Sequence, residues 1–206
     1  MTLYKLTDEN GETYNHTKWG PGVTHTATGK GPLCGPGWIY AYTHPLLAVL
    51  LNPAHANFKH PRLWEAEGIV GIEDKGLKVG CKSLTTTKEI DLPKITAKQT
   101  VKFAIFCALE ACVDPRFVSW AKDWLDGKNR SSLDATTAYA AAYDTAYASV
   151  AAYDVAYSAA ASVYDAAYAA YSASAASAAF AAVHAVHATN TLDLASLAEK
   201  AAQEEL

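Results

Sequence analysis

Glycine and proline are confined to the front of the chain, and this asymmetry constrains the fold more than any other feature. All twelve glycines lie at or before Gly127, and all eight prolines lie at or before Pro115. Both residue types interrupt helices, so a stretch that lacks them can be helical over its whole length. The sequence therefore predicts a turn-rich front part and a long helical part, divided near residue 96.

We predict an α+β fold with a mostly antiparallel candidate ligand-binding domain in residues 1–95 and an α-helical assembly region in residues 96–206. The glycine-rich stretch 19–37 is expected to be a loop. A short helix is expected over 43–53, with Thr43 as its N-cap and Asn52-Pro53 as its end. Strands are expected over residues 2–6, over 38–42 from its large β-forming residues, over 63–74 from its alternating pattern, and over 77–92 as one strand or two.

The helical part is expected to begin with two amphipathic helices, over 97–113 and 115–126. Phe117, Trp120 and Trp124 recur at helical spacing and should be buried, and Gly127 should follow the end of the second helix. A third helix is expected to begin at Ser131 or Ser132, either of which can act as an N-cap, and to continue to about Ala188.

A tyrosine repeat dominates this third segment. The pattern Tyr-Asp-x-Ala-Tyr begins at Tyr143, Tyr153 and Tyr164. A spacing of ten or eleven residues is close to three helical turns, so the tyrosines should share one face, most simply as a buried seam between helices. An unbroken helix of about fifty residues would be about 75 Å long. The tract should therefore fold back around residues 172–177 or pack against another copy. The candidate assembly residues are Tyr143, Tyr147, Tyr153, Tyr157, Tyr164 and Tyr168.

Charge is distributed unevenly along the chain. Residues 1–130 contain 16 Lys and Arg against 13 Asp and Glu, a net +3, whereas residues 131–206 contain one against eight, a net −7. The tail therefore disfavours nucleic acid as a partner, because phosphate binding needs clustered cations. The sequence contains no long uninterrupted apolar run, so neither a membrane span nor a secretory signal is expected. The four cysteines lack a C-x-x-C pair and are expected to be reduced thiols, which favours a cytoplasmic protein.

The candidate ligand site lies in the front domain, where aromatic side chains are mixed with histidine and cationic residues. Aromatic rings can stack on a base, and Lys30 or Arg62, together with loop amides, can bind phosphate. No metal site is predicted, because His44, His55 and His60 match no standard spacing of ligands. His184 and His187 are three residues apart but are expected to be solvated. The candidate ligand-binding residues are Trp19, His25, Lys30, Trp38, Tyr40, His44 and Arg62.

The order of a strand, a loop and then GWIYAYTHPLLAVLL resembles a part of ADP-ribosyltransferase-like domains. In that family a glycine-led strand with aromatic residues is followed by a short helix, and a glutamate on a late strand orients the nicotinamide ribose. The resemblance implies an enzyme that uses NAD, with Glu89 as its catalytic carboxylate. The first strand departs from the family pattern, because it offers Tyr4 and Lys5 where a His or Arg is expected.

The overall layout is similar to uncharacterised phage and bacterial proteins. These join a small α+β domain to a two-helix segment with Asp-Pro-Arg, here Asp114, Pro115 and Arg116, and then to an alanine-rich tract. The resemblance implies a phage or mobile-element accessory protein in the cytoplasm of a bacterial host. Such proteins commonly block or sequester host components, including those of host defence.

Three functional hypotheses follow. We favour a non-catalytic protein without a cofactor that binds or sequesters a nucleotide-like ligand and forms a homo-oligomer through its helical tail. The first alternative is the NAD-using, ADP-ribosyltransferase-like enzyme with Glu89. The second alternative is a structural module whose tyrosine face binds and blocks a host protein.

Overall fold

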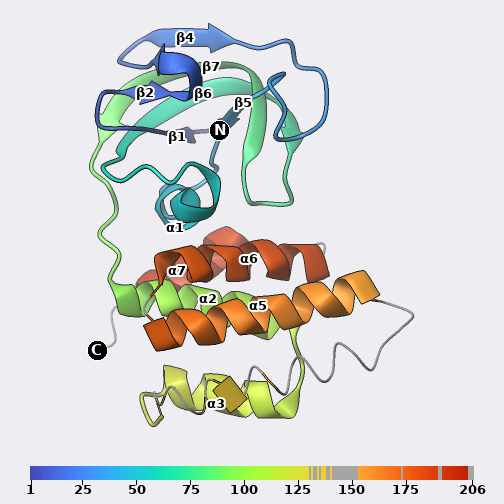
Figure 1. Ribbon diagram of the computed structural model, residues 1–206. Coiled ribbons are helices and arrows are strands. Elements are labelled where there is room, and N and C mark those ends of the chain that lie inside the picture. Colours follow the sequence, from blue (N-terminus) through green and yellow to red (C-terminus); the bar gives the residue numbers. More distant parts are fainter. Residues whose placement is uncertain are drawn as a thin grey trace. The chain divides into compact units, whose positions relative to one another are not determined.

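The computed structural model describes residues 1–129, 131, 134, 136, 137, 140, 153–172, 174–189 and 192–203, with backbone only for 153–157. The fold is α+β, with an antiparallel sheet and six α-helices in these residues. The chain divides into two compact units, Met1–Lys94 and Ile95–Leu206 (Figure 1). None of the helices in the described residues is long and apolar enough to cross a membrane.

The front unit is built on an antiparallel sheet with the strand order β1 (Leu3–Thr7), β6 (Arg62–Glu73), β7 (Val79–Ile90) and β4 (Val23–Thr26). A fifth strand, β5 (Ile39–Ala41), also pairs with β7. A two-stranded ribbon of β2 (Glu12–Thr13) and β3 (Thr17–Lys18) flanks the 3₁₀ turn η1 (Tyr14–His16). We expected the stretch 19–37 to be a loop, but its residues 23–26 form a strand that pairs with β7.

The sheet curls so that its first strand meets β5. Tyr4 and Tyr42 exchange two backbone hydrogen bonds of 2.8 Å, which join β1 to β5 beyond the strand order given above. Gly68 permits the close approach of β6 to β7, because a Cβ there would lie 2.5 Å from the carbonyl oxygen of Ser83. The curled sheet encloses a small core of Leu3, Trp19, Ala41, Ala66, Val79, Cys81 and Leu84.

Helix α1 (Pro45–His55) differs from expectation at both ends. His44 rather than Thr43 is the N-cap, and its Nδ1 accepts a hydrogen bond of 3.3 Å from the amide of Leu46. The helix also continues past Pro53 to His55, since a proline in the last turn removes only one backbone donor. The Asn52 side chain then bonds both the amide and the carbonyl of Phe58, at 3.1 and 2.9 Å, and so fixes the chain that follows.

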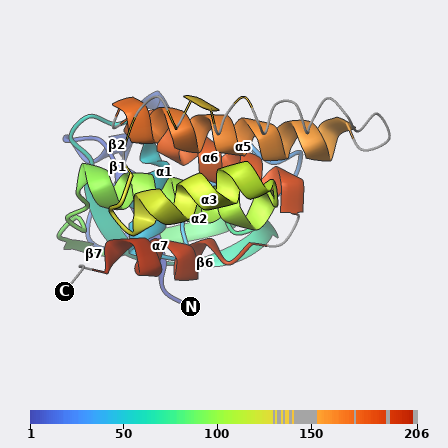
Figure 2. The same cartoon turned by 90° about the horizontal axis from the view of Figure 1, so that it is seen from below.

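The second unit contains α2 (Ala97–Ala111), α3 (Pro115–Leu125), α5 (Tyr153–Ser172), α6 (Ala175–Thr189) and α7 (Leu194–Ala202). Helix α2 contacts each of the other four (Figures 1 and 2). Thr96 and Gln99 form a capping box at its start. The prediction for α3 is confirmed: Phe117, Trp120 and Trp124 are buried. Gly127 follows α3 with a φ of 73°, a left-handed conformation that glycine adopts without strain.

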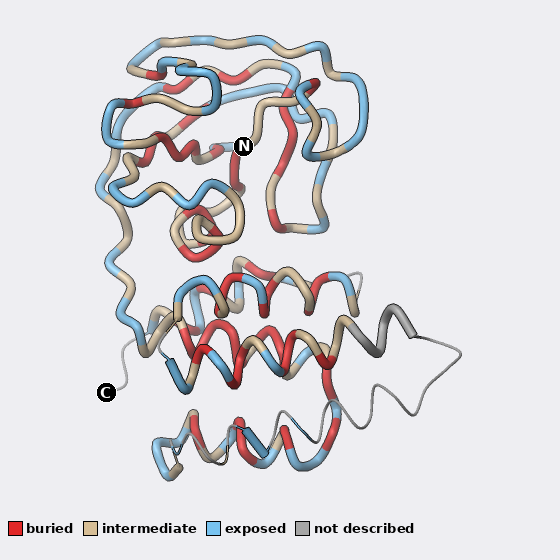
Figure 3. Tube along the Cα trace, viewed as in Figure 1, coloured by how far each residue is buried: buried red, intermediate tan, exposed pale blue. Residues whose placement is uncertain are grey.

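The third predicted helix is not continuous to Ala188. It ends at Ser172, and α6 begins at Ala175, so the two helices form a hairpin within the region where we expected the tract to fold back. Small side chains let them approach closely. Ser162 donates a hydrogen bond of 2.8 Å to the carbonyl of Ala181. The buried alanines include Ala160, Ala166, Ala167 and Ala169 on α5, and Ala178, Ala181, Ala182 and Ala185 on α6. Figure 3 colours the buried residues of the helical unit red.

The tyrosines described on α5 do not form the buried seam that we expected. Tyr164, Tyr168 and Tyr171 are 42%, 45% and 64% exposed, and the rings of Tyr164 and Tyr168 stack with centroids 6.0 Å apart. Alanine occupies the helix interface instead. Tyr153 and Tyr157 lie on α5, but their side chains are outside the described residues, as are Tyr143 and Tyr147 entirely. Assembly through the tyrosine face stays a prediction.

Ala166 provides a test of this alanine interface. Because its side chain is fully buried, Ala166→Leu should overpack the interface and lower the free energy of unfolding by about 1–3 kcal/mol. Ala176→Leu, on an exposed position of α6, is the matched control and should change it by less than about 0.5 kcal/mol. Urea denaturation followed by circular dichroism measures both. Equal effects of the two substitutions would contradict the packing described here.

Candidate functional site

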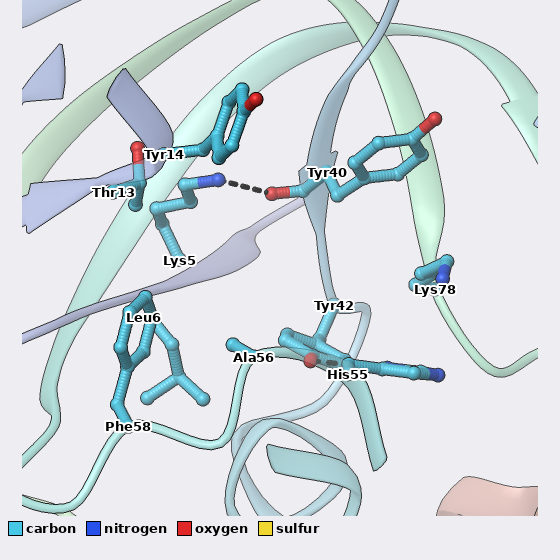
Figure 4. Close-up of a pocket in the computed structure, with 10 residues that line it drawn as sticks. All are labelled: Lys5, Leu6, Thr13, Tyr14, Tyr40, Tyr42, His55, Ala56, Phe58 and Lys78. Atoms are coloured by element: carbon cyan, nitrogen blue, oxygen red, sulfur yellow. Dashed lines mark hydrogen bonds between the residues drawn. The ribbon is translucent and has the colours of Figure 1, made fainter. Parts of the chain in front are cut away.

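The front unit contains a pocket of about 370 Å³. Its walls come from β1, from the end of β2 and η1, from β5 and the residue after it, from the end of α1 and the chain that follows, and from the residue before β7 (Figure 4). The curled sheet and the Asn52 hydrogen bonds bring these segments together. The volume falls within the range of small-ligand sites. The residues that line it are Lys5, Leu6, Thr13, Tyr14, Tyr40, Tyr42, His55, Ala56, Phe58 and Lys78.

Lys5 is the most unusual of these residues because it is a buried cation. Its Nζ donates a hydrogen bond of 2.7 Å to the carbonyl oxygen of Tyr40 and lies 5.1 Å from the ring centroid of Trp19. No carboxylate of the described residues forms an ion pair with it. Burial lowers the pKa of Lys5 to about 8, and the nearby Cys81 opposes that change only in part. An unpaired buried ammonium is costly, and an anion would stabilise it.

Lys78 supplies a second cation on the other side of Tyr40. Its Nζ lies 5.3 Å from the centroid of the Tyr40 ring and 3.8 Å from the carboxylate of Asp74. The Tyr40 hydroxyl donates a hydrogen bond of 3.0 Å to the carbonyl of Gly35. Burial, followed by the neighbouring Cys34, raises the pKa of Tyr40. The Tyr40 ring is therefore fixed between its own hydroxyl contact and the Lys78 ammonium.

Tyr42 and His55 form a stacked pair in the wall of the pocket (Figure 4). Their ring centroids are 5.9 Å apart, and the Tyr42 hydroxyl lies 3.2 Å from Nδ1 of His55. Burial raises the pKa of Tyr42 far above its usual value, so its hydroxyl stays protonated and can donate. Burial, and secondarily the charge of Lys78, lowers the pKa of His55 to about 4. Neutral His55 thus accepts at Nδ1 and retains a proton on Nε2 for a further partner.

Aromatic and apolar groups complete the walls. Leu6 and Phe58 lie on one side, and Tyr14, which is 86% exposed, stands at the rim. The Thr13 hydroxyl accepts a hydrogen bond of 2.9 Å from Nε1 of Trp19, which links the pocket wall to the core. Two cations, several rings and a neutral imidazole suit a small ligand that has an aromatic ring and a negative charge.

The lowered pKa of His55 makes stability sensitive to acid. Between pH 6.5 and pH 4 the unfolded chain binds a proton at His55 and the folded chain does not, so the free energy of unfolding falls as the pH falls. We expect a loss of about 2 kcal/mol, after allowance for the partial exposure of the ring. His55→Gln keeps a hydrogen-bond acceptor for Tyr42 but cannot be protonated in this range, so it should lack this loss of stability. Urea denaturation at pH 4, 5 and 6.5 measures it, and parallel curves for the two proteins would contradict this assignment.

Of the sequence-predicted ligand residues, Tyr40 lines the pocket and Trp19 lies directly behind it, through Lys5 and Thr13. His25 packs edge-on against Trp19, with centroids 4.6 Å apart, and its Nε2 lies 2.8 Å from the carbonyl of Lys18. Trp19 therefore supports the pocket wall from behind, and His25 packs against Trp19. Neither residue lines the pocket.

The remaining predicted residues are placed elsewhere. His44 caps α1, and Lys30 is exposed in the long loop. Trp38 donates from Nε1 to the carbonyl of Gly31 at 3.1 Å and covers Gly71 and Gly80 of the sheet. None of the three lines the pocket. His44 therefore acts as a helix cap, and Trp38 packs on the sheet.

Arg62 and Glu89 pair with each other. Two hydrogen bonds join them, one of 2.7 Å from Nε to Oε1 and a second from the other guanidinium nitrogen. The guanidinium also lies 4.9 Å from the ring centroid of Trp64. The hydrogen bond from Arg62 lowers the pKa of Glu89, so its carboxylate is ionised and paired. Neither side chain is among those that line the pocket.

Sequence reasoning missed Lys5, Tyr42, His55 and Lys78 as a group. One signal was present: Leu3, Lys5 and Thr7 alternate along β1, and the pattern places Lys5 on the same side as two buried neighbours. In the helical unit, His184 is not simply solvated, because its Nδ1 lies 2.8 Å from the carboxylate of Asp165 on α5. No group of three potential metal ligands gathers within the described ranges.

No family model matches this chain, and neither a curated protein nor a solved structure matches it. The resemblances to ADP-ribosyltransferase-like domains and to phage and bacterial proteins therefore stay predictions.

Proposed function

We propose that the front unit is a non-catalytic binding module for a small aromatic anion of nucleotide type. One observation carries the proposal: the Lys5 ammonium is buried in the wall of a pocket and has no carboxylate partner in the described residues. Burying a cation without a counter-ion is unfavourable, and an anionic ligand would remove that cost. Lys78 adds a second ammonium group to the same pocket, and the Asp74 carboxylate 3.8 Å away balances part of its charge.

The other walls define how the ligand would lie. Its ring would stack against tyrosine or phenylalanine, of which Tyr42 and Phe58 line the interior and Tyr14 the rim. Its negative group would meet Lys5 or Lys78 and accept a hydrogen bond from Nε2 of His55. A phage or mobile-element accessory protein that sequesters a host nucleotide would use such a site without any turnover.

The test is incubation of the purified chain with a mixture of nucleotides that includes NAD and cyclic di- and oligonucleotides. Mass spectrometry follows the free pool before and after the protein is heated. A species that is depleted and then returns unchanged supports sequestration. A species converted to a new product would instead favour an enzyme, and Glu89→Gln would then test the NAD-using alternative. An unchanged pool would count against the proposal.

A depleted nucleotide gives a sharper prediction. Lys78→Ala should weaken its binding about fivefold or more, since a charge-assisted contact contributes about 1 kcal/mol or more to a bound anion. Lys18→Ala is the matched control, because its side chain is 80% exposed and it does not line the pocket. Isothermal titration calorimetry on both variants measures the effect. If both variants lose the same affinity, Lys78 makes no direct contact with the nucleotide and acts only through the net charge of the protein.

A further inference from the structure

We propose that Lys5 captures an aromatic aldehyde that carries a negative group, and holds it covalently as an imine inside the pocket. This inference rests on the proposed function, because it uses the same pocket, and it adds the reactive group of the ligand. Three properties of the site carry it: the amine lines a cavity, it is buried, and it has no acidic partner in the described residues.

The hydrogen bonding of Lys5 is compatible with a protonated imine. An ammonium has three N–H donors, and within the described residues Lys5 has one hydrogen-bond acceptor, the carbonyl oxygen of Tyr40 at 2.7 Å. A protonated imine has one N–H, which that single acceptor satisfies. It also keeps its positive charge, which the Trp19 ring 5.1 Å away stabilises.

The chemistry needs no reagent beyond the aldehyde. The neutral amine of Lys5 attacks the carbonyl carbon, the carbonyl oxygen takes up a proton, and the nitrogen releases one to give a carbinolamine. The hydroxyl then leaves as water with one more proton while the nitrogen lone pair forms the C=N bond. Overall, the lysine ammonium and the aldehyde give the protonated imine and one water molecule, and no electrons are gained or lost.

Burial also supplies the reactive form of the amine. The pKa of Lys5 is about 8, so at pH 7 its neutral fraction exceeds that of an ordinary exposed lysine by about 300-fold. Lys78 lies beyond the Tyr40 ring, on the other side of that residue from the carbonyl that Lys5 contacts (Figure 4). A ligand whose aldehyde and negative group leave the ring in different directions could reach both cations.

The test uses pyridoxal 5′-phosphate as a probe, because it combines a heteroaromatic ring, an aldehyde and a phosphate. The full chain at pH 7 is treated with less than one equivalent, reduced with borohydride, digested and mapped by mass spectrometry. Lys18, which is 80% exposed, is the internal reference. We expect the reduced adduct on Lys5 to exceed that on Lys18 at least tenfold. Pyridoxine 5′-phosphate, which has the same ring and phosphate but an alcohol in place of the aldehyde, is the competitor and should suppress the Lys5 adduct.

The outcomes separate this inference from the proposed function. Preferential labelling of Lys5 that the alcohol suppresses supports the imine. Labelling of Lys5 no stronger than that of Lys18 overturns it, and so does labelling that the alcohol leaves unchanged. Binding of the alcohol by calorimetry without a Lys5 adduct would overturn the imine and leave the proposed function standing. Three results together would overturn both the imine and the proposed function: the alcohol does not bind, Lys5 is not labelled, and the nucleotide pool stays unchanged.

Discussion

Replacing Phe117 by alanine is expected to lower the free energy of unfolding by about 3–5 kcal/mol. Phe117 is fully buried on α3, with its ring 5.8 Å from that of Trp120. It belongs to one core cluster with side chains of α2, α5 and α6, among them Ile105, Val163 and Ala178. Alanine there removes most of the contact area of the ring and leaves a cavity that rigid helices fill only in part.

Urea denaturation followed by tryptophan fluorescence measures this loss. Val113→Ala is the control, because Val113 is 89% exposed just before α3 and its truncation should change the free energy by less than about 0.5 kcal/mol. A single domain is stable by about 5–15 kcal/mol, so the Phe117→Ala variant should have a clearly lower urea midpoint. A shift no larger than that of the control would show that α3 is not packed as described.

The aromatic face of α3 and the division into turn-rich and helical parts illustrate what sequence can predict. Both rest on local rules: spacing along a helix, and the exclusion of glycine and proline from helix interiors. The break between α5 and α6 lies within residues 172–177, where we expected the tract to fold back from its length, but its exact position does not follow from such rules because the tract contains neither glycine nor proline. Ser174 caps α6, because its hydroxyl oxygen accepts a hydrogen bond of 3.2 Å from the amide of Ser177. Serine recurs throughout the tract, so tertiary packing rather than composition selects this position.

The pocket was harder to predict than the fold because distant segments create it. Residue type and loop composition pointed to Trp19, Lys30 and Trp38, yet the loop that contains the last two is not part of the wall. The wall instead depends on the backbone bridge between Tyr4 and Tyr42, 38 positions apart, and on the chain after α1. Neither contact has a local sequence signature.

Lys5→Met should raise stability and abolish most ligand binding. A pKa lowered from 10.5 to about 8 corresponds to about 3 kcal/mol of destabilisation by the buried charge. Methionine fills a similar volume without that charge but leaves the carbonyl of Tyr40 without its donor, so we expect a net gain of about 2 kcal/mol at pH 7. Binding of a retained nucleotide should weaken about 30-fold or more, as for loss of one member of a buried charge pair.

The pH dependence identifies the source of the stability gain. Below pH 8 both the folded and the unfolded chain keep Lys5 protonated, and the full cost is present. Between pH 8 and 10.5 the unfolded chain binds the proton and the folded chain does not, so the native protein gains stability relative to Lys5→Met as the pH rises. Denaturation at pH 7 and pH 10 should show the two proteins converge. If the Lys5→Met variant is more stable and still binds the nucleotide, then Lys5 destabilises the fold without contributing to ligand binding. That result would overturn the proposed function.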